Sequence, residues 1–123
     1  MGKIAGIEGR DVGYNWTLAP CVDINANPDT PTCTTRTAGT SAEQVLEFTS
    51  EYIRGCQEHG LMATAKHFPG DGFGIYDQHL TTAEIPQSFE QWQQTSDNSM
   101  FFGTSILNAF WEGLGMALGG QNP

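Results

Sequence analysis

Short apolar runs alternate with polar, turn-forming stretches along most of the chain. Residues 16–24, WTLAPCVDI, are mostly apolar and are followed by the turn-rich NANPDTP. This pattern predicts a buried strand that ends near Asp23. Pro20 weakens that prediction, because proline lacks the N–H group that a central strand needs. Residues 61–68, LMATAKHF, form another short apolar run and predict a second strand.

A helix is predicted between these two strands. Ser41 and Gln44 have the spacing of a capping box, and Gly60 supplies a stop at the far end. Four residues at helical spacing form one face of this segment: Val45, Phe48, Tyr52 and Cys56. We therefore expect that face to pack against the core.

Two further helical segments are expected toward the end of the chain. Ser88 and Gln91 repeat the capping spacing just after a proline. Residues 100–120 follow helical spacing and are long enough to span a membrane. Glu112 lies near the middle of that stretch, where an acid costs about 2.5–3.5 kcal/mol on insertion scales. A helix that buries one face against protein is therefore preferred to a membrane span.

The order strand, helix, strand predicts the βαβ unit of a parallel sheet and an α/β fold class. Parallel strands share one carboxyl edge, where α/β proteins place their ligand sites. Asp23 and Asn25 would reach this edge from the first strand, and Lys66 and His67 from the second. The glycine-punctuated loop AKHFPGDGFGIYDQHLTT, residues 65–82, would lie on the same rim.

Length and charge narrow the function classes. At 123 residues the chain allows one domain, and its formal charge of −9 argues against binding to nucleic acid or anionic lipid. The three cysteines are odd in number and form no CxxC pair, so neither a disulfide framework nor a zinc ribbon is indicated. Because the first ten residues hold no apolar signal core either, a cytoplasmic location is favoured.

The rim loop carries the candidate chemistry. The Lys66 ammonium and the His67 imidazole can donate hydrogen bonds to adjacent sugar hydroxyls, with Phe68, Phe73, Tyr76 or Trp16 as possible apolar faces for the ring. Asp77 and His79 are separated by one residue, which places both side chains on one side of an extended segment. The carboxylate could then orient the imidazole for general acid–base work, whereas a plain ion pair in a loop would show the same spacing.

Two other interpretations of the loop are weaker. Four residues, His67, Asp71, Asp77 and His79, could ligate a metal, but the neighbouring Lys66 ammonium would oppose a cation and no compact ligand motif is present. The sequence GDGFG lacks the lysine and the Ser or Thr of a phosphate loop, which argues against nucleotide binding. Neither a metal nor a cofactor is therefore expected.

The motifs together resemble glycoside hydrolase family 3, in particular its β-N-acetylglucosaminidase-like branch. Four motifs carry the resemblance in order: NWTLAPCVDINANP, the arginine of TTRTAG, AKHFPGDG and DQH. The resemblance covers residues 3 to about 95 and implies that residues 1–96 form part of a (β/α)8 TIM barrel. Residues 97–123, which do not share the resemblance, are expected to form an apolar helical tail. A full barrel typically needs about 250 residues.

The resemblance also implies roles. Arg36, Lys66 and His67 would hold the terminal sugar of a β-linked saccharide, and Asp77 with His79 would form the acid/base dyad. The family's aspartate nucleophile lies in a strand with a Ser-Asp dipeptide, and we do not assign that role to Ser96–Asp97, which is polar and close to the loop.

Two function classes follow from the sequence. One is a segment of a retaining glycosidase that is inactive without further barrel segments, and the other is a noncatalytic sugar-binding or self-assembling module. An incomplete barrel exposes strand edges, so we expect a homo-oligomer or a complementing barrel segment as partner.

Overall fold

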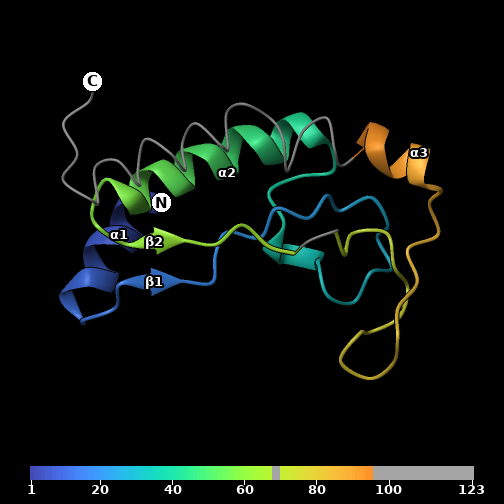
Figure 1. Ribbon diagram of the computed structural model, residues 1–123, viewed down its shortest axis with the longest axis horizontal. Helices are drawn as coiled ribbons and strands as arrows, with labels where there is room; N and C mark the ends of the chain where they lie inside the picture. The colour runs from blue at the N-terminus through green and yellow to red at the C-terminus, as the bar shows by residue number, and fades with distance from the viewer. Residues whose placement is uncertain (68–69, 96–123) are drawn as a thin grey trace.

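The computed structural model describes residues 1–67 and 70–95 (Figure 1). In order, its elements are α1 (Gly2–Asp11), β1 (Trp16–Thr17), the 3-10 helix η1 (Thr34–Arg36), α2 (Ala42–Gln57), β2 (Met62–Ala63) and α3 (Phe89–Trp92). The predicted tail, with the stretch that could have crossed a membrane, lies outside the described residues. Within the described part of the chain, no helix has the length and apolarity needed to cross a membrane.

The predicted βαβ unit is confirmed. β1 and β2 pair in parallel, with Trp16 opposite Met62 and Thr17 opposite Ala63, and α2 connects them across one face of this small sheet (Figure 1). The regular strands are shorter than the apolar runs predicted. Pro20 interrupts the first run because it has no N–H to donate, and pairing resumes only as an isolated bridge between Cys21 and Lys66.

Burial along the first run also differs from the prediction. Trp16 is 56% exposed, and its indole nitrogen donates to the Thr64 hydroxyl at 2.5 Å. The buried part of the run is its carboxyl end, where Val22 and Ile24 form a core cluster with Val45 of α2. Asp23 lies between the two buried apolar residues and is itself fully buried. The core therefore holds the end of this segment, and with it Asp23, in a fixed position.

The helix α2 begins as predicted. The Ser41 hydroxyl accepts a hydrogen bond from the Gln44 amide at 3.4 Å, which caps the first turn. The helix ends at Gln57, and Gly60 takes the positive φ of 77° that glycine tolerates best. The predicted apolar face is only partly right, because Val45 and Cys56 are buried whereas Phe48 is 44% exposed.

A helix lies at each end of the described part of the chain: α3 was predicted and α1 was not. α3 is short, and Ser88 with Gln91 forms the predicted capping box. α1 was not predicted, because glycines and charged residues interrupt its apolar pattern. Its glycines allow a close approach to α2: a methyl group added at Gly2 would overlap the Tyr52 carbonyl, and one at Gly55 would lie 2.5 Å from the Lys3 amide nitrogen. Small residues therefore define this helix contact.

Candidate functional site

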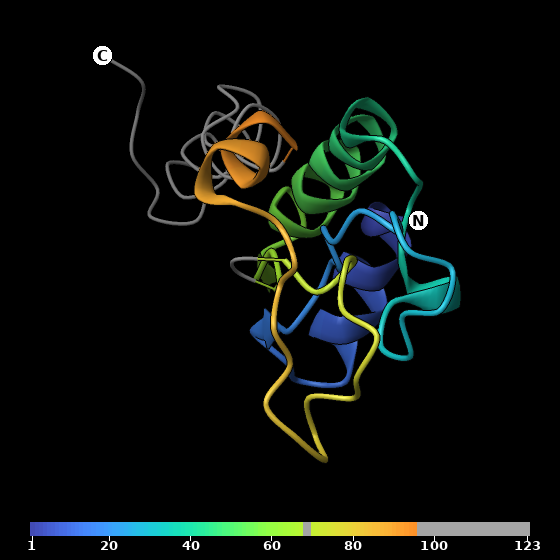
Figure 2. The same cartoon turned by 90° about the vertical axis from the view of Figure 1, so that its right-hand side faces the viewer.

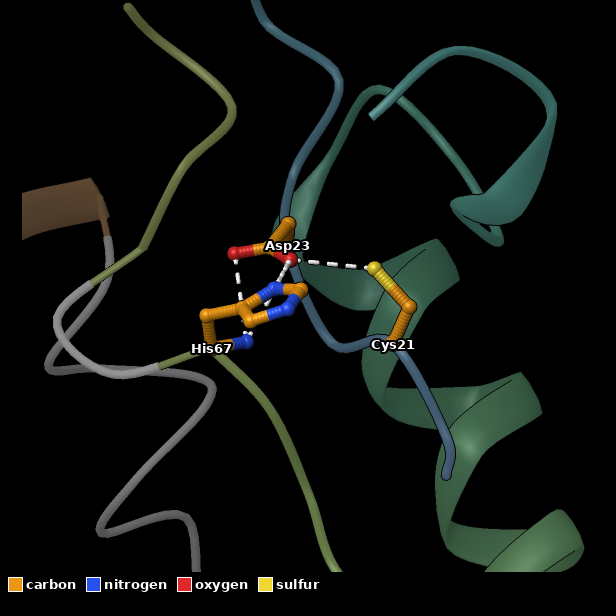
Figure 3. A group of neighbouring side chains, drawn as sticks. All are labelled: Cys21, Asp23 and His67. Atoms are coloured by element: carbon orange, nitrogen blue, oxygen red, sulfur yellow. Dashed lines mark hydrogen bonds and ion pairs between the residues drawn. The ribbon is translucent and has the colours of Figure 1, made fainter. Parts of the chain in front are cut away.

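The site begins where the two parallel segments end. Figure 3 shows Asp23 between the side chains of Cys21 and His67. Cys21 and Asp23 are two residues apart on one extended segment, so their side chains share a side. The second segment is held in register because the Val22 amide donates to the Lys66 carbonyl at 2.6 Å. His67 follows directly and meets Asp23, as the shared carboxyl edge predicted.

Asp23 is the central hydrogen-bond acceptor of this rim. Its Oδ1 accepts from the main-chain amide of Asp71 at 2.8 Å, and its Oδ2 is 2.7 Å from Nδ1 of His67. The Cys21 thiol donates to the same Oδ2 at 3.0 Å. A longer contact joins the His67 amide to both oxygens, at 3.3 and 3.4 Å. Because an ionised carboxylate only accepts hydrogen bonds, Nδ1 of His67 carries the proton and the ring orientation is fixed.

The glycine loop closes over this cluster. The Thr30 hydroxyl, which is buried, donates to the carbonyls of Gly72 at 3.3 Å and Gly74 at 2.7 Å. The main-chain amide of Asn27 donates to the Gly72 carbonyl at 3.0 Å, while an added methyl group at Gly72 would overlap the Ile24 carbonyl. The loop therefore packs tightly against the segment that follows Asp23, and only glycine fits at position 72.

Asp71 connects the rim to the second predicted pair. Its Oδ2 lies 3.3 Å from Nδ1 of His67 and accepts a hydrogen bond from the Gln78 side-chain amide. Gln78 stands between Asp77 and His79 in the sequence. A short chain of contacts thus links His67 to the residues of the predicted dyad.

Asp77 and His79 are in contact, although not through the extended backbone that was predicted. Residues 77–80 form a turn, in which the Asp77 carbonyl accepts from the Leu80 amide at 3.0 Å. Asp77 Oδ1 accepts from the His79 amide at 2.9 Å and lies 2.7 Å from its Nδ1. The His79 main-chain N–H, followed by its side chain, holds the pKa of Asp77 below its usual value. The imidazole is 76% exposed and open to a ligand.

The two remaining predicted site residues are Lys66 and Arg36, and their side chains do not contact one another. Lys66 is half-buried, and its main chain forms the bridge to Cys21. Arg36 ends the 3-10 helix η1 and is exposed; its guanidinium donates to the Thr32 carbonyl at 3.1 Å. The structure records no contact between the Arg36 guanidinium and Lys66 or His67, so a common sugar subsite is not formed by direct contact of these side chains.

A pocket of about 650 Å³ lies beside the turn that carries the dyad. Its lining includes Phe73 and Tyr76, two of the aromatic residues expected to face a sugar, together with Asn27, Ile75, Thr81, Thr82, Glu84 and Pro86. Figure 2 shows the yellow segment of the chain, which follows the rim, as a loop that projects away from the helices. A smaller pocket of about 200 Å³ adjoins it and is lined by Asp71 and Gln78 among others. The acid/base candidates therefore stand next to a hollow of ligand size.

Sequence reasoning missed part of this constellation. Asp23 was placed on the rim but not assigned a role, and neither Cys21 nor Gln78 was assigned to the site. The available signal for Asp23 was an acidic residue flanked by Val22 and Ile24, because a buried carboxylate between apolar neighbours needs donors. Gln78 gave no such signal, since its partner becomes apparent only when the loop is folded.

Comparisons with known families and proteins agree on one relationship. Residues 1–108 match the glycosyl hydrolase family 3 N terminal domain. A β-N-acetylglucosaminidase/β-glucosidase of Cellulomonas fimi is 42% identical over 92 residues, which are 75% of this chain and 16% of that protein. A β-hexosaminidase of Stenotrophomonas maltophilia is 33% identical over 84 residues, 68% of this chain and 24% of that protein. The chain thus spans between a sixth and a quarter of the length of these relatives.

Solved structures show the same fold. A β-glucoside phosphorylase bound to 2FGlc superposes with a TM-score of 0.78 at 37% identity, over 91% of this chain and 19% of the other. A glycoside hydrolase family 3 β-N-acetylglucosaminidase from Paenibacillus sp. gives a TM-score of 0.76 at 33% identity, over 89% of this chain and 19% of that structure.

Proposed function

The chain belongs to glycosyl hydrolase family 3, through the N-terminal domain of that family, and from this premise we propose that its rim and loop form part of a β-glycosidase site. The proposed substrate is a saccharide with a terminal β-linked N-acetylglucosamine or glucose, as the name of the Cellulomonas fimi relative suggests. The observation that carries the proposal is the contact between Asp77 and His79 beside the aromatic-lined pocket.

In this proposal His79 is the general acid and then the general base. As the glycosidic C–O bond breaks, the imidazolium gives its proton to the departing oxygen, so that the leaving group departs as a neutral alcohol. A carboxylate nucleophile holds the sugar as a covalent intermediate, and the neutral imidazole then takes a proton from the water that releases it. Asp77 stabilises the imidazolium and fixes its orientation, as its 2.7 Å contact with Nδ1 allows.

We assign the nucleophile to no residue of this chain. Ser96–Asp97, the Ser-Asp dipeptide considered above, lies outside the described residues. Retaining hydrolysis needs both the nucleophile and the acid/base group. We therefore expect hydrolysis when the remaining segments of the family fold are supplied and almost none from the chain alone.

Sugar binding is proposed for the rim. Nδ1 of His67 faces Asp23, so Nε2 is the ring nitrogen left to meet a sugar hydroxyl. Lys66 and Arg36 would contribute charged donors, which hold hydroxyl groups more strongly than neutral donors do. Phe73 and Tyr76 of the pocket would face the apolar side of the sugar ring.

Isothermal calorimetry with N-acetylglucosamine and glucose tests the binding part. Lys66→Ala should weaken a saturable affinity by about 10- to 100-fold, since one charge-assisted hydrogen bond contributes roughly 1.5–3 kcal/mol. Lys3→Ala is the matched control, because Lys3 is exposed on α1, which packs against α2 and contributes no residue to the rim. Equal affinity in both variants would remove Lys66 from the site.

A second candidate follows from the similarity to a β-glucoside phosphorylase: transfer of the glycosyl group to inorganic phosphate instead of water. The glycosidic bond would break in the same way, and a phosphate oxygen would form the new bond to the anomeric carbon. Product analysis with and without phosphate, using the chain with the complementing family segments, separates the two. Sugar 1-phosphate favours transfer to phosphate and free sugar favours hydrolysis, while saturable sugar binding without either product favours a noncatalytic binding module.

A further inference from the structure

The cluster at the rim contains three different kinds of metal ligand. The Cys21 sulfur, an Asp23 carboxylate oxygen and a His67 ring nitrogen all lie within 4.8 Å of one another (Figure 3). They come from two segments that the parallel register holds together, so the grouping is a product of the fold rather than of one flexible loop. We propose that this cluster binds a zinc ion.

The ligand types and their spacing suit zinc. Zinc takes sulfur at about 2.3 Å and nitrogen or oxygen at about 2.0–2.2 Å in a tetrahedron, which puts neighbouring ligand atoms roughly 3.2–3.7 Å apart. Here Asp23 Oδ2 is 3.0 Å from the Cys21 sulfur and 2.7 Å from Nδ1 of His67. Shifts of less than about 1 Å would open these hydrogen-bond distances to ligand spacing.

The two oxygens of Asp23 are held differently, and this difference favours metal binding. Oδ1 is anchored by the main-chain amide of Asp71 at 2.8 Å. Oδ2 instead receives the two side-chain protons, from the Cys21 thiol and from Nδ1 of His67. A zinc ion would replace these protons, while Oδ1 keeps the main-chain bond that orients the carboxylate. Asp71 supplies a further oxygen, since its Oδ2 lies 3.3 Å from Nδ1 of His67.

The electrostatic environment is suited to a cation. Two carboxylates at one partly buried position attract a dication. His67 is 30% exposed and leaves a path by which the ion can enter. The buried Asp23 carboxylate adds a negative charge to the cluster, which opposes the repulsion of a cation by the neighbouring Lys66 ammonium.

Zinc at this place would change the outer face of His67. With Nδ1 bound to the metal, Nε2 carries the ring proton and donates, whereas Nε2 of a neutral ring accepts when Nδ1 donates its proton to Asp23. The ion would orient His67 from its inner side, in the way that Asp23 does in the structure. The site stands independently of the proposed glycosidase activity, and its readouts do not involve turnover.

Metal titration of the 123-residue chain tests the proposal. We expect one zinc ion per chain by calorimetry, and with cobalt as a spectroscopic probe we expect the charge-transfer absorption of a thiolate ligand. Cys21→Ser should abolish that absorption and weaken zinc binding by about tenfold or more, and Asp23→Asn should also weaken binding. Circular dichroism of each variant shows whether it is folded, and Cys21→Ala repeats the test with a residue that cannot ligate.

Two controls identify the site. Cys56→Ser removes a buried thiol that donates to the Gly2 carbonyl between α1 and α2, and His79→Ala removes the other histidine that pairs with an aspartate. Both should leave zinc binding unchanged. Three results would overturn the proposal. They are unchanged binding in folded Cys21→Ser, loss of binding in His79→Ala, and no binding by the unmodified chain at roughly 1 mM zinc, a concentration typical of weak sites.

Discussion

Replacing Asp23 by alanine should destabilise the fold strongly. The side chain is fully buried and accepts hydrogen bonds from the Asp71 amide at 2.8 Å, from Nδ1 of His67 at 2.7 Å and from the Cys21 thiol at 3.0 Å. Alanine would leave all three donors without their acceptor. It would also leave a small cavity at the rim, in the place of the buried carboxylate.

The size of the effect follows from these contacts. A hydrogen bond to a charged group contributes about 1.5–3 kcal/mol, and removing one partner of a buried ion pair costs about 3–5 kcal/mol. We expect a loss of about 4 kcal/mol in the free energy of unfolding, against a total of about 5–15 kcal/mol for a domain. With a urea dependence of about 2 kcal/mol per molar, the midpoint should fall by about 2 M.

Urea unfolding of the chain in EDTA, followed by circular dichroism, measures this loss without any contribution from metal binding. Asp29→Ala is the matched control, because its carboxylate is exposed and its backbone amide still donates to Asn27 after the change. The control should stay within about 0.5 kcal/mol of the unmodified chain. Asp23→Asn keeps the shape and one acceptor, so its loss should be intermediate. A loss below about 1 kcal/mol in Asp23→Ala would refute this account of the rim.

Three other predictions address the loop and the assembly. Gly72→Ala should destabilise the chain by about 1–3 kcal/mol or more in the same unfolding assay, because its methyl group would overlap a carbonyl, whereas Gly74→Ala, with its nearest contact at 3.9 Å, should change little. Because the pKa of Asp77 is lower in the folded chain than in the unfolded chain, its ionised carboxylate stabilises the fold at pH values above the unfolded pKa. This contribution to stability is lost as the pH falls through the folded pKa. Carboxyl NMR titration should show this pKa rising only partly in His79→Ala, because the main-chain N–H is its largest cause and remains; a full return to the ordinary value would contradict that order of causes. Light scattering should show a dimer or larger at micromolar concentration, because Trp16 and the strand residue opposite it are exposed on a two-stranded sheet, and a compact monomer would contradict this.

The sequence predicted the elements whose signals are local. The caps at Ser41 and Ser88 and the stop at Gly60 depend on neighbouring residues, so they could be read directly and are confirmed. The parallel pairing followed from the order of the apolar runs. α1 was missed because its stability comes from glycine-mediated packing against α2, and no local pattern reports a contact of that kind.

Part of the site could also be predicted from the sequence. The carboxyl-edge rule placed Asp23 and His67 at one rim, and the structure confirms that they meet. The contact of Asp77 with His79 was predicted from an extended segment, but it is made by a turn in which the carboxylate also accepts the His79 amide. The link through Gln78 depends on the path of a loop whose tight approach at Gly72 is a tertiary contact. The roles of the predicted site residues stay predictions.

The central claim is that His79 delivers a proton in a β-glycosidase site. Its most direct test measures turnover by the chain mixed with the separately produced remainder of the Cellulomonas fimi relative, using an alkyl and a dinitrophenyl β-N-acetylglucosaminide. The account predicts that His79→Ala slows the alkyl substrate about 100-fold or more and the dinitrophenyl substrate far less, because only the poor leaving group needs a proton. Equal losses on both substrates would contradict it.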